Sequence, residues 1–102
     1  MEKEYNTYDD IYDLNIVDVK PLDNYDLIIT YSNNEVISYN MEHLFKNKLE
    51  VLKDINLFKK VFIDEFGNIS WNIDDNIDSN DNWDNRIDVS KETVYFEGIR
   101  IK

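Results

Sequence analysis

The chain has 102 residues, a formal net charge of −11, 42% hydrophobic residues, one His and no Cys. This length suits one small domain with too many apolar residues to stay disordered, and the missing Cys excludes a disulfide framework, a Cys-ligated zinc site and a thiol nucleophile. Because so acidic a surface repels phosphate backbones and anionic lipid, we expect no direct contact with nucleic acid or membrane and a basic protein as the natural partner.

Period-two alternation predicts strands in the first part of the chain. Polar and apolar residues alternate over 15–20 until Pro21 ends the run, and the alternation resumes over 25–31. Asn33-Asn34 separates this run from a third at 36–39. Asn tolerates the positive φ that a two-residue turn requires, so the second and third strands should form a hairpin.

The next segment has apolar residues at helical spacing. Asn40 is a good N-cap, and the spacing over 41–52 predicts a short helix with a break near Asn47. Asp54 is a second N-cap candidate, ahead of one or two further helical turns that end near Lys59 and Lys60. We expect the lysines of this segment to form a solvated helix face.

A second hairpin is predicted where the runs 61–63 and 69–71 flank a turn that contains Gly67. Together these elements indicate an α+β fold, with a small, largely antiparallel sheet of about five strands and one or two short helices packed on one face. The predicted core consists of Val17, Leu27, Ile29, Tyr31, Leu44, Phe45, Leu52, Phe58, Ile63 and Trp71.

The last part of the chain begins with an unusual segment. Ten of the fourteen residues at 72–85 are Asn or Asp, whose side chains bond their own backbone in preference to helix or sheet, so this segment, the acidic loop, is predicted as a loop. A short turn around Gly98 and a closing strand at 99–101 should follow. We expect an acidic N-terminal extension at 1–14 and one α+β domain at 15–102.

Four segments, at 17–27, 32–36, 52–61 and 67–71, carry a family resemblance. Their order resembles the small bacterial domains of the DUF2442 family, and 86–95 resembles the closing segment of that family. The chain departs from the family pattern in its N-terminal extension, in the acidic loop and in Asn34, where Gly is usual.

The resemblance implies an α+β fold without established catalytic residues. It also implies an accessory or neutralising protein, because relatives are often encoded beside small proteins of toxin–antitoxin-like gene pairs. Some relatives are fused to DNA-binding helix-turn-helix modules, of which this sequence has none.

The acidic loop is the most informative segment for function. Asp74, Asn76 and Asp78 alternate as oxygen ligands do in a calcium loop. Ser79 stands at the sixth position, where the calcium loop needs Gly, and Asn85 at the twelfth, where it needs a bidentate Glu. A solvated loop, an acidic binding surface and a metal site are therefore three interpretations, of which the metal site fits least well.

Aromatic residues accompany the acids in the acidic loop and in the N-terminal extension. An exposed Trp83 would supply apolar area beside carboxylates, as interface hot spots do, although it could also pin the loop to the core. Tyr5, Tyr8 and Tyr12 alternate with acids in the N-terminal extension, as in a short acidic helix or a tail that orders on binding. The predicted partner-binding residues are Tyr8, Asp9, Asp10, Tyr12, Asp74, Asp75, Asp78, Asp81, Trp83 and Asp84.

Catalysis is poorly supported by the remaining residues. His43 has no Ser or carboxylate arranged around it in a recognisable motif. Asp64 and Glu65 are adjacent at a hairpin corner, where turn chemistry explains them, and the two Gly form no phosphate loop. We predict no enzyme, no catalytic residue, no metal and no cofactor.

These observations favour a non-enzymatic protein, monomeric or homodimeric, that occludes a basic surface of a partner such as a nuclease or toxin, as an antitoxin-like or inhibitor protein would. One alternative is a phage or mobile-element inhibitor of a host defence nuclease, of the anti-CRISPR type, that mimics nucleic acid or blocks its groove. Another is a calcium-binding or small-ligand domain. With no apolar run long enough for a membrane and no signal peptide pattern at the start, we expect a cytoplasmic protein.

Overall fold

The computed structural model describes residues 14–74, 76–79 and 82–102. The strands are β1 Ile16–Pro21, β2 Asp26–Tyr31, β3 Val36–Asn40, β4 Phe62–Ile63, β5 Ile69–Asn72, β6 Arg86–Val89 and β7 Ile99–Arg100. The helices are the 3₁₀ helices η1 Glu42–Leu44, η2 Asn47–Lys53 and η3 Trp83–Asn85 and the α-helices α1 Ile55–Phe58 and α2 Lys91–Glu97. Among these residues, no helix is both long and apolar enough to cross a membrane.

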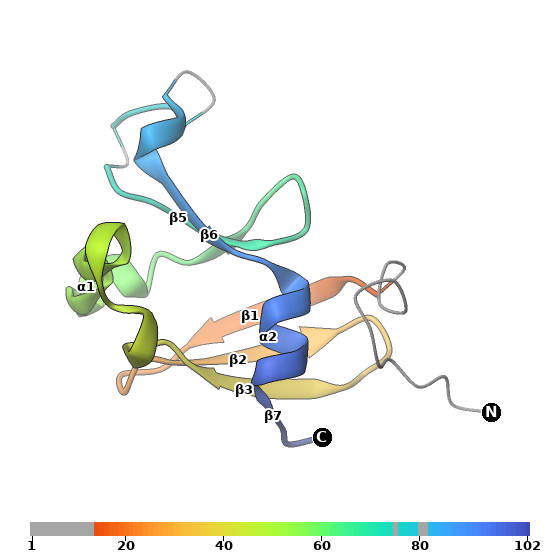
Figure 1. The fold of residues 1–102 in the computed structure, drawn as a ribbon. Helices are drawn as coiled ribbons and strands as arrows, with labels where there is room; N and C mark the ends of the chain where they lie inside the picture. The colour runs from red at the N-terminus through yellow and green to blue at the C-terminus, as the bar shows by residue number, and fades with distance from the viewer. Residues whose placement is uncertain (1–13, 75, 80–81) are drawn as a thin grey trace.

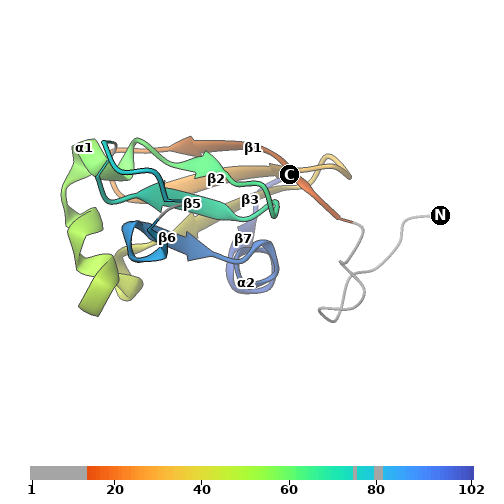
Figure 2. The same cartoon turned by 90° about the horizontal axis from the view of Figure 1, so that it is seen from above.

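The strands form two antiparallel sheets, so the fold is α+β as predicted, but the single sheet of about five strands is wrong. Sheet A has the order β1-β2-β3-β7 and sheet B the order β4-β5-β6. Figures 1 and 2 show sheet B and α2 on the same side of sheet A. The segment from η1 to α1 carries the chain away from β3, so the second predicted hairpin starts a separate sheet instead of joining the first.

The first hairpin forms as the sequence predicts, but its turn has three residues, 32–34, instead of the expected two. β2 pairs with β3, and Asn34 has a φ of 71° in the connecting turn. The Tyr31 N–H closes the turn on the Glu35 carbonyl at 2.9 Å. Asn at this position therefore supplies the left-handed conformation that a Gly would otherwise provide.

The segment after β3 is helical, as predicted, and it forms two 3₁₀ helices. The Asn40 side chain accepts the Glu42 N–H at 3.0 Å, and Asn47 has a φ of 55°. This left-handed residue begins η2, directly after the two residues 45–46 that interrupt the helical segment, and the predicted break near Asn47 is confirmed. The predicted cap at Asp54 is also confirmed, since its carboxylate accepts the Asn56 N–H at 3.0 Å at the start of α1.

The C-terminal part contains two elements that the sequence patterns did not predict. β6 pairs with β5, and α2 stands where a short turn was expected, capped by the Ser90 hydroxyl, which accepts the Thr93 N–H at 3.1 Å. The predicted closing strand is confirmed as β7, which pairs with β3. A Cβ on Gly98 would lie 2.3 Å from Cγ2 of Ile37, so the chain passes from α2 to β7 in direct contact with the sheet.

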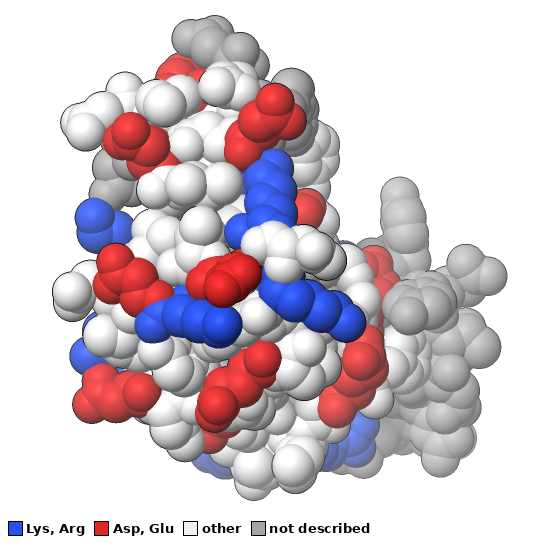
Figure 3. All heavy atoms as spheres, turned by 60° about the vertical axis from the view of Figure 1, so that its left-hand side comes forward, with Lys and Arg blue, Asp and Glu red and all other residues white. Residues whose placement is uncertain are grey.

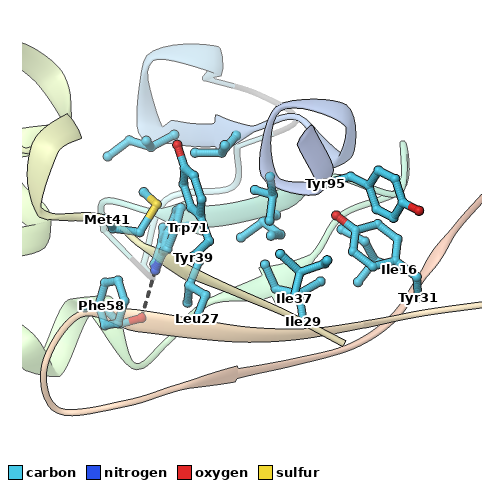
Figure 4. Close-up of a cluster of buried hydrophobic side chains, with 14 of the residues drawn as sticks. Ile16, Leu27, Ile29, Tyr31, Ile37, Tyr39, Met41, Phe58, Trp71 and Tyr95 are labelled. Carbon is cyan, nitrogen blue, oxygen red and sulfur yellow. Dashed lines mark hydrogen bonds between the residues drawn. The ribbon is translucent and has the colours of Figure 1, made fainter. Parts of the chain in front are cut away.

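The core lies between sheet A, sheet B and α2 (Figure 4). Trp71 is fully buried, and its indole N–H donates to the Phe58 carbonyl at 2.8 Å. Six predicted core residues are buried, namely Leu27, Ile29, Tyr31, Leu52, Phe58 and Trp71, and three pack partly buried against them, namely Leu44, Phe45 and Ile63. Val17 was predicted wrongly and is 57% exposed, because a register shift between Ile16 and Asp18 turns it out of the core.

Candidate functional site

The acidic loop joins β5 to β6 at the end of sheet B, at the top of Figure 1. Its two ends are held together by the Ile73 N–H, which donates to the Asn85 carbonyl at 2.7 Å. Three further backbone bonds run within it, from the Ile77 N–H to the Asp74 carbonyl, from the Asn82 N–H to the Asp78 carbonyl and from the Asn85 N–H to the Asn82 carbonyl. The described part of the loop therefore has a hydrogen-bonded framework of its own.

The side chain of Asn85 is the centre of this framework and is only 5% exposed. Its carbonyl oxygen accepts the Asp74 N–H at 2.8 Å. Its amide donates to the Asp74 carbonyl at 3.0 Å and to the Ile77 carbonyl at 2.9 Å. One amide group at the β6 end of the loop thus satisfies three backbone groups near its β5 end, in a segment with little apolar content.

Ser79 is the second buried polar residue of the loop, at 4% exposure. Its hydroxyl donates to the Asn72 side chain and accepts from the Asn85 amide at 3.1 Å. Ser79 and Asn85 are the two positions that depart from the calcium-loop pattern, and both hold the loop through hydrogen bonds instead. Among the described side chains there is no group of three or more His, Cys, Asp or Glu that could hold a metal ion.

The described carboxylates of the loop face outward. Asp74, Asp78 and Asp84 are all exposed, and Ile77 beside them is 41% exposed. Asp74 additionally accepts the Asn76 N–H at 2.9 Å, which fixes the direction of its carboxylate. Because the polar groups that need partners are satisfied inside, the loop presents acids and one aliphatic side chain to solvent.

The remaining predicted binding residues lie outside the described residues. These are Tyr8, Asp9, Asp10 and Tyr12 of the N-terminal extension and Asp75 and Asp81 of the acidic loop. The backbone of Trp83 begins η3, but its side chain also falls outside the described part. Of the ten predicted residues, the structure therefore describes the side chains of Asp74, Asp78 and Asp84, which are exposed on the same loop.

Arg86, the basic residue closest to the loop in the sequence, is engaged at the base of the loop. Its guanidinium forms an ion pair with Glu65 at 2.7 Å and lies over the Phe62 ring, 5.8 Å from its centre. Backbone hydrogen bonding and the bond from Arg86 together hold the pKa of Glu65 below its ordinary value. The positive charge of Arg86 is therefore directed at Glu65 on the neighbouring hairpin.

The face that carries η2 and α1 has a different character. Figure 3 shows acidic and basic side chains interleaved on it. Lys59 forms an ion pair with Asp23, and Lys53 one with Glu50 at 3.4 Å. The lysines of this segment are exposed, as predicted: Lys46, Lys48, Lys53, Lys59 and Lys60.

The residues considered for catalysis, the pair Asp64–Glu65 and His43, form hydrogen bonds or ion pairs with neighbouring residues of the fold. Asp64 is 8% exposed and accepts the Phe66 N–H at 2.9 Å and the Asn68 N–H at 3.0 Å, so it shapes the turn between β4 and β5. Its neighbour Glu65 turns to Arg86, which confirms that the two carboxylates serve different partners. The imidazole of His43 contacts the Tyr39 hydroxyl at 3.2 Å.

Sequence reasoning missed a polar cluster beside the β2–β3 turn of sheet A, where side chains of α2 and β7 meet Glu35. The Tyr95 hydroxyl donates to Glu35 at 2.6 Å and accepts from Arg100 at 3.2 Å, and Glu35 and Arg100 form an ion pair at 3.0 Å. Burial, followed by the bond to Glu35, raises the pKa of Tyr95 to about 12. In the sequence, only the presence of Tyr95 pointed to this cluster, because the helix α2 that carries it was not predicted.

Comparisons with known proteins give one result. The family model described as "Protein of unknown function (DUF2442)" matches residues 16–100. No curated protein and no solved structure matches the chain.

Proposed function

The chain belongs to the DUF2442 family of unknown function, and we propose that it is a non-enzymatic binding protein whose acidic loop occludes a basic surface of a partner protein. The proposal includes an antitoxin-like or inhibitor role. The observation that supports it best is the buried Asn85 side chain, which holds the loop while Asp74, Asp78 and Asp84 face solvent.

A framework of this kind favours binding in two ways. The described part of the loop loses little conformational entropy on association, because the Asn85 side chain already bonds the backbone at Asp74 and Ile77 and is itself bonded to Ser79. Exposed carboxylates on one loop steer a basic partner during diffusion and raise the association rate, while Ile77 offers apolar area at the contact. Both effects act without any catalytic group.

The test neutralises the three described carboxylates with isosteric changes. Asp74→Asn, Asp78→Asn and Asp84→Asn are combined, because Asn keeps the local turn bonds. The tagged wild-type chain is used to capture a partner from its native lysate, and association with that purified partner is followed by stopped flow. We expect the triple variant to associate about tenfold more slowly at low salt, and wild-type association to slow as salt rises.

A matched control removes the same number of charges elsewhere. Glu42, Glu50 and Glu97 are exposed and lie outside the loop, so their combined change to Gln removes the same number of negative charges. This control should keep most of the association rate. Equal slowing in both triple variants would mean that only overall charge matters and would refute the role of the loop.

A second variant separates the framework from the charge. Asn85→Ala leaves every carboxylate in place but removes the side chain that bonds Asp74 and Ile77. The association rate should stay near that of the wild type, while dissociation becomes faster because the loop must order on binding. Unchanged dissociation would show that the fixed loop geometry has no part in binding.

A further inference from the structure

Sheet A has a second face, opposite to the core, that no described element covers. Figure 1 shows α2 and sheet B on one side of this sheet only. The side chains that alternate with the core residues point to the other side. This outer face consists of Asp18, Lys20, Ile28, Thr30, Val36, Ser38, Ile99 and Ile101, with Asp26 and Asn40 at one end.

The strand register arranges the outer face in two parallel rows. In the first row Lys20 pairs with Ile28, Ile28 with Ser38, and Ser38 with Ile99.

In the second row Asp18 pairs with Thr30 and Thr30 with Val36. The Ile101 N–H donates to the Val36 carbonyl at 2.8 Å, so Ile101 completes this row.

These rows expose an apolar strip on a very acidic protein. Ile99 is 71% exposed and Ile101 is 56% exposed. Ile28 and Val36 are partly exposed and do not belong to the side chains that pack against the core. Neighbouring apolar residues of this kind on one sheet face are typical of an interaction surface.

We propose that two copies of the chain pack through their outer faces, about a two-fold axis that runs across the strands between the two rows. The axis lays the first row of one copy on the second row of the other. Ile99 then faces Ile101 of the second copy, and Ile28 faces Thr30 of the second copy. Lys20 faces Asp18 of the second copy, and the symmetry repeats each contact.

Charge identifies a second copy as the occupant. The first row ends in Lys20 and the second in Asp18, so the two rows together carry no net charge. The whole chain, in contrast, has a net charge of −11. Asp26 lies outside the rows and accepts the amides of Asn24 and Asn40 at 2.9 Å. A copy of the same face brings the complementary charge pattern, whereas a basic partner would find no excess of acids in the two rows.

Sedimentation of the full chain over a concentration series tests the proposal. The wild type should form a dimer, and Ile99→Asp combined with Ile101→Asp should raise the dimer dissociation constant by about a hundredfold or more, because the interface is symmetric and each change counts twice. Phe66→Ser is the control, since it removes a 65% exposed aromatic side chain at the tip of the β4–β5 hairpin. It should leave the dissociation constant unchanged.

A charge exchange tests the register of the interface. Asp18→Lys alone should weaken the dimer about tenfold by facing Lys20 with a like charge, and Lys20→Asp alone should do the same. The double exchange should restore the wild-type constant. Glu42→Lys changes the net charge as Asp18→Lys does but lies elsewhere, so it should not weaken the dimer.

Several outcomes overturn the proposal: a monomer at every concentration, an undisturbed dimer in the double Ile variant, or a double exchange that fails to restore association. The inference is independent of the proposed binding of a basic partner. Salt separates the two, because it screens the repulsion between two acidic copies and should strengthen the dimer, whereas it should weaken association with a basic partner.

Discussion

The Tyr95 hydroxyl joins three elements through one atom. From α2 it donates to Glu35 beside the β2–β3 turn, and it accepts from Arg100 on β7. Its ring meets the Tyr31 ring edge-on, with 5.0 Å between the ring centres. A bond between a neutral donor and a carboxylate in a nearly buried place contributes more than an ordinary hydrogen bond, so this hydroxyl should matter for stability.

We predict that Tyr95→Phe lowers the free energy of unfolding by about 2 kcal/mol at neutral pH, because Glu35 and Arg100 lose a partner. The effect should depend on pH. The pKa of Tyr95 is about 12 in the folded protein and 10.0 ordinarily, so the unfolded chain loses this proton first and wild-type stability falls as pH rises from 10 toward 12.

Urea unfolding at pH 8 and near pH 11 measures both effects of Tyr95→Phe. The gap between variant and wild type should be smaller at the higher pH. Tyr31 stays in both proteins, and burial, the main cause of its raised pKa, acts on its hydroxyl in both. A gap that stays constant or widens at high pH would contradict the assignment of the bond to the neutral phenol.

The acidic loop shows how far residue-level prediction from sequence reaches. Its loop character and its acidity follow from the local preference of Asn and Asp for turns. The role of Asn85 does not, because ten of the fourteen residues are Asn or Asp and only burial distinguishes this one. Which acids face outward depends on contacts with Ser79 and the loop backbone, which spacing alone does not reveal.

Elements with their own turn or cap chemistry are the ones that sequence predicts. Both hairpins, the break at Asn47 and the cap at Asp54 depend on residues close in the chain. β6 and α2 are short and consecutive, with Ser90 as their only boundary. Neither the two-residue period of a strand nor the roughly 3.6-residue period of a helix is repeated often enough there to be recognised. The division into two sheets depends on where the chain between β3 and β4 packs, which is a tertiary property.

The junction of α2 and β7 needs the absence of a side chain at Gly98. A Cβ there would lie 2.3 Å from Cγ2 of Ile37 and 2.7 Å from the Val94 carbonyl oxygen. We predict that Gly98→Ala lowers the free energy of unfolding by about 2 kcal/mol, because the helix or the strand must shift. Urea unfolding measures the change.

Gly67 provides the control for the Gly98 variant. It has a φ of 79°, and a Cβ at this position would meet no other atom within 4 Å, so only the backbone conformation limits substitution. Gly67→Asn should therefore be nearly neutral, since Asn tolerates this conformation. If Gly98→Ala were as mild as Gly67→Asn, close packing would not be what requires glycine at the end of α2.

Charge acts on the molecule as a whole. Twenty-two acids face eleven basic residues, and ion pairs such as Arg86 with Glu65 and Lys59 with Asp23 occur among many unbalanced carboxylates. Exposed pairs contribute little to stability, whereas the repulsion among unbalanced charges extends across the surface. The compact state should therefore gain when these charges are screened.

We predict that raising NaCl from about 20 mM to about 500 mM, which shortens the Debye length severalfold, increases the free energy of unfolding by about 1 kcal/mol. Urea unfolding at a protein concentration where sedimentation shows a single species excludes a contribution from association. The combined change of Asp74, Asp78 and Asp84 to Asn removes three charges from the total of −11 and should reduce this salt response. Stability that fell with salt would mean that local ion pairs outweigh the overall repulsion.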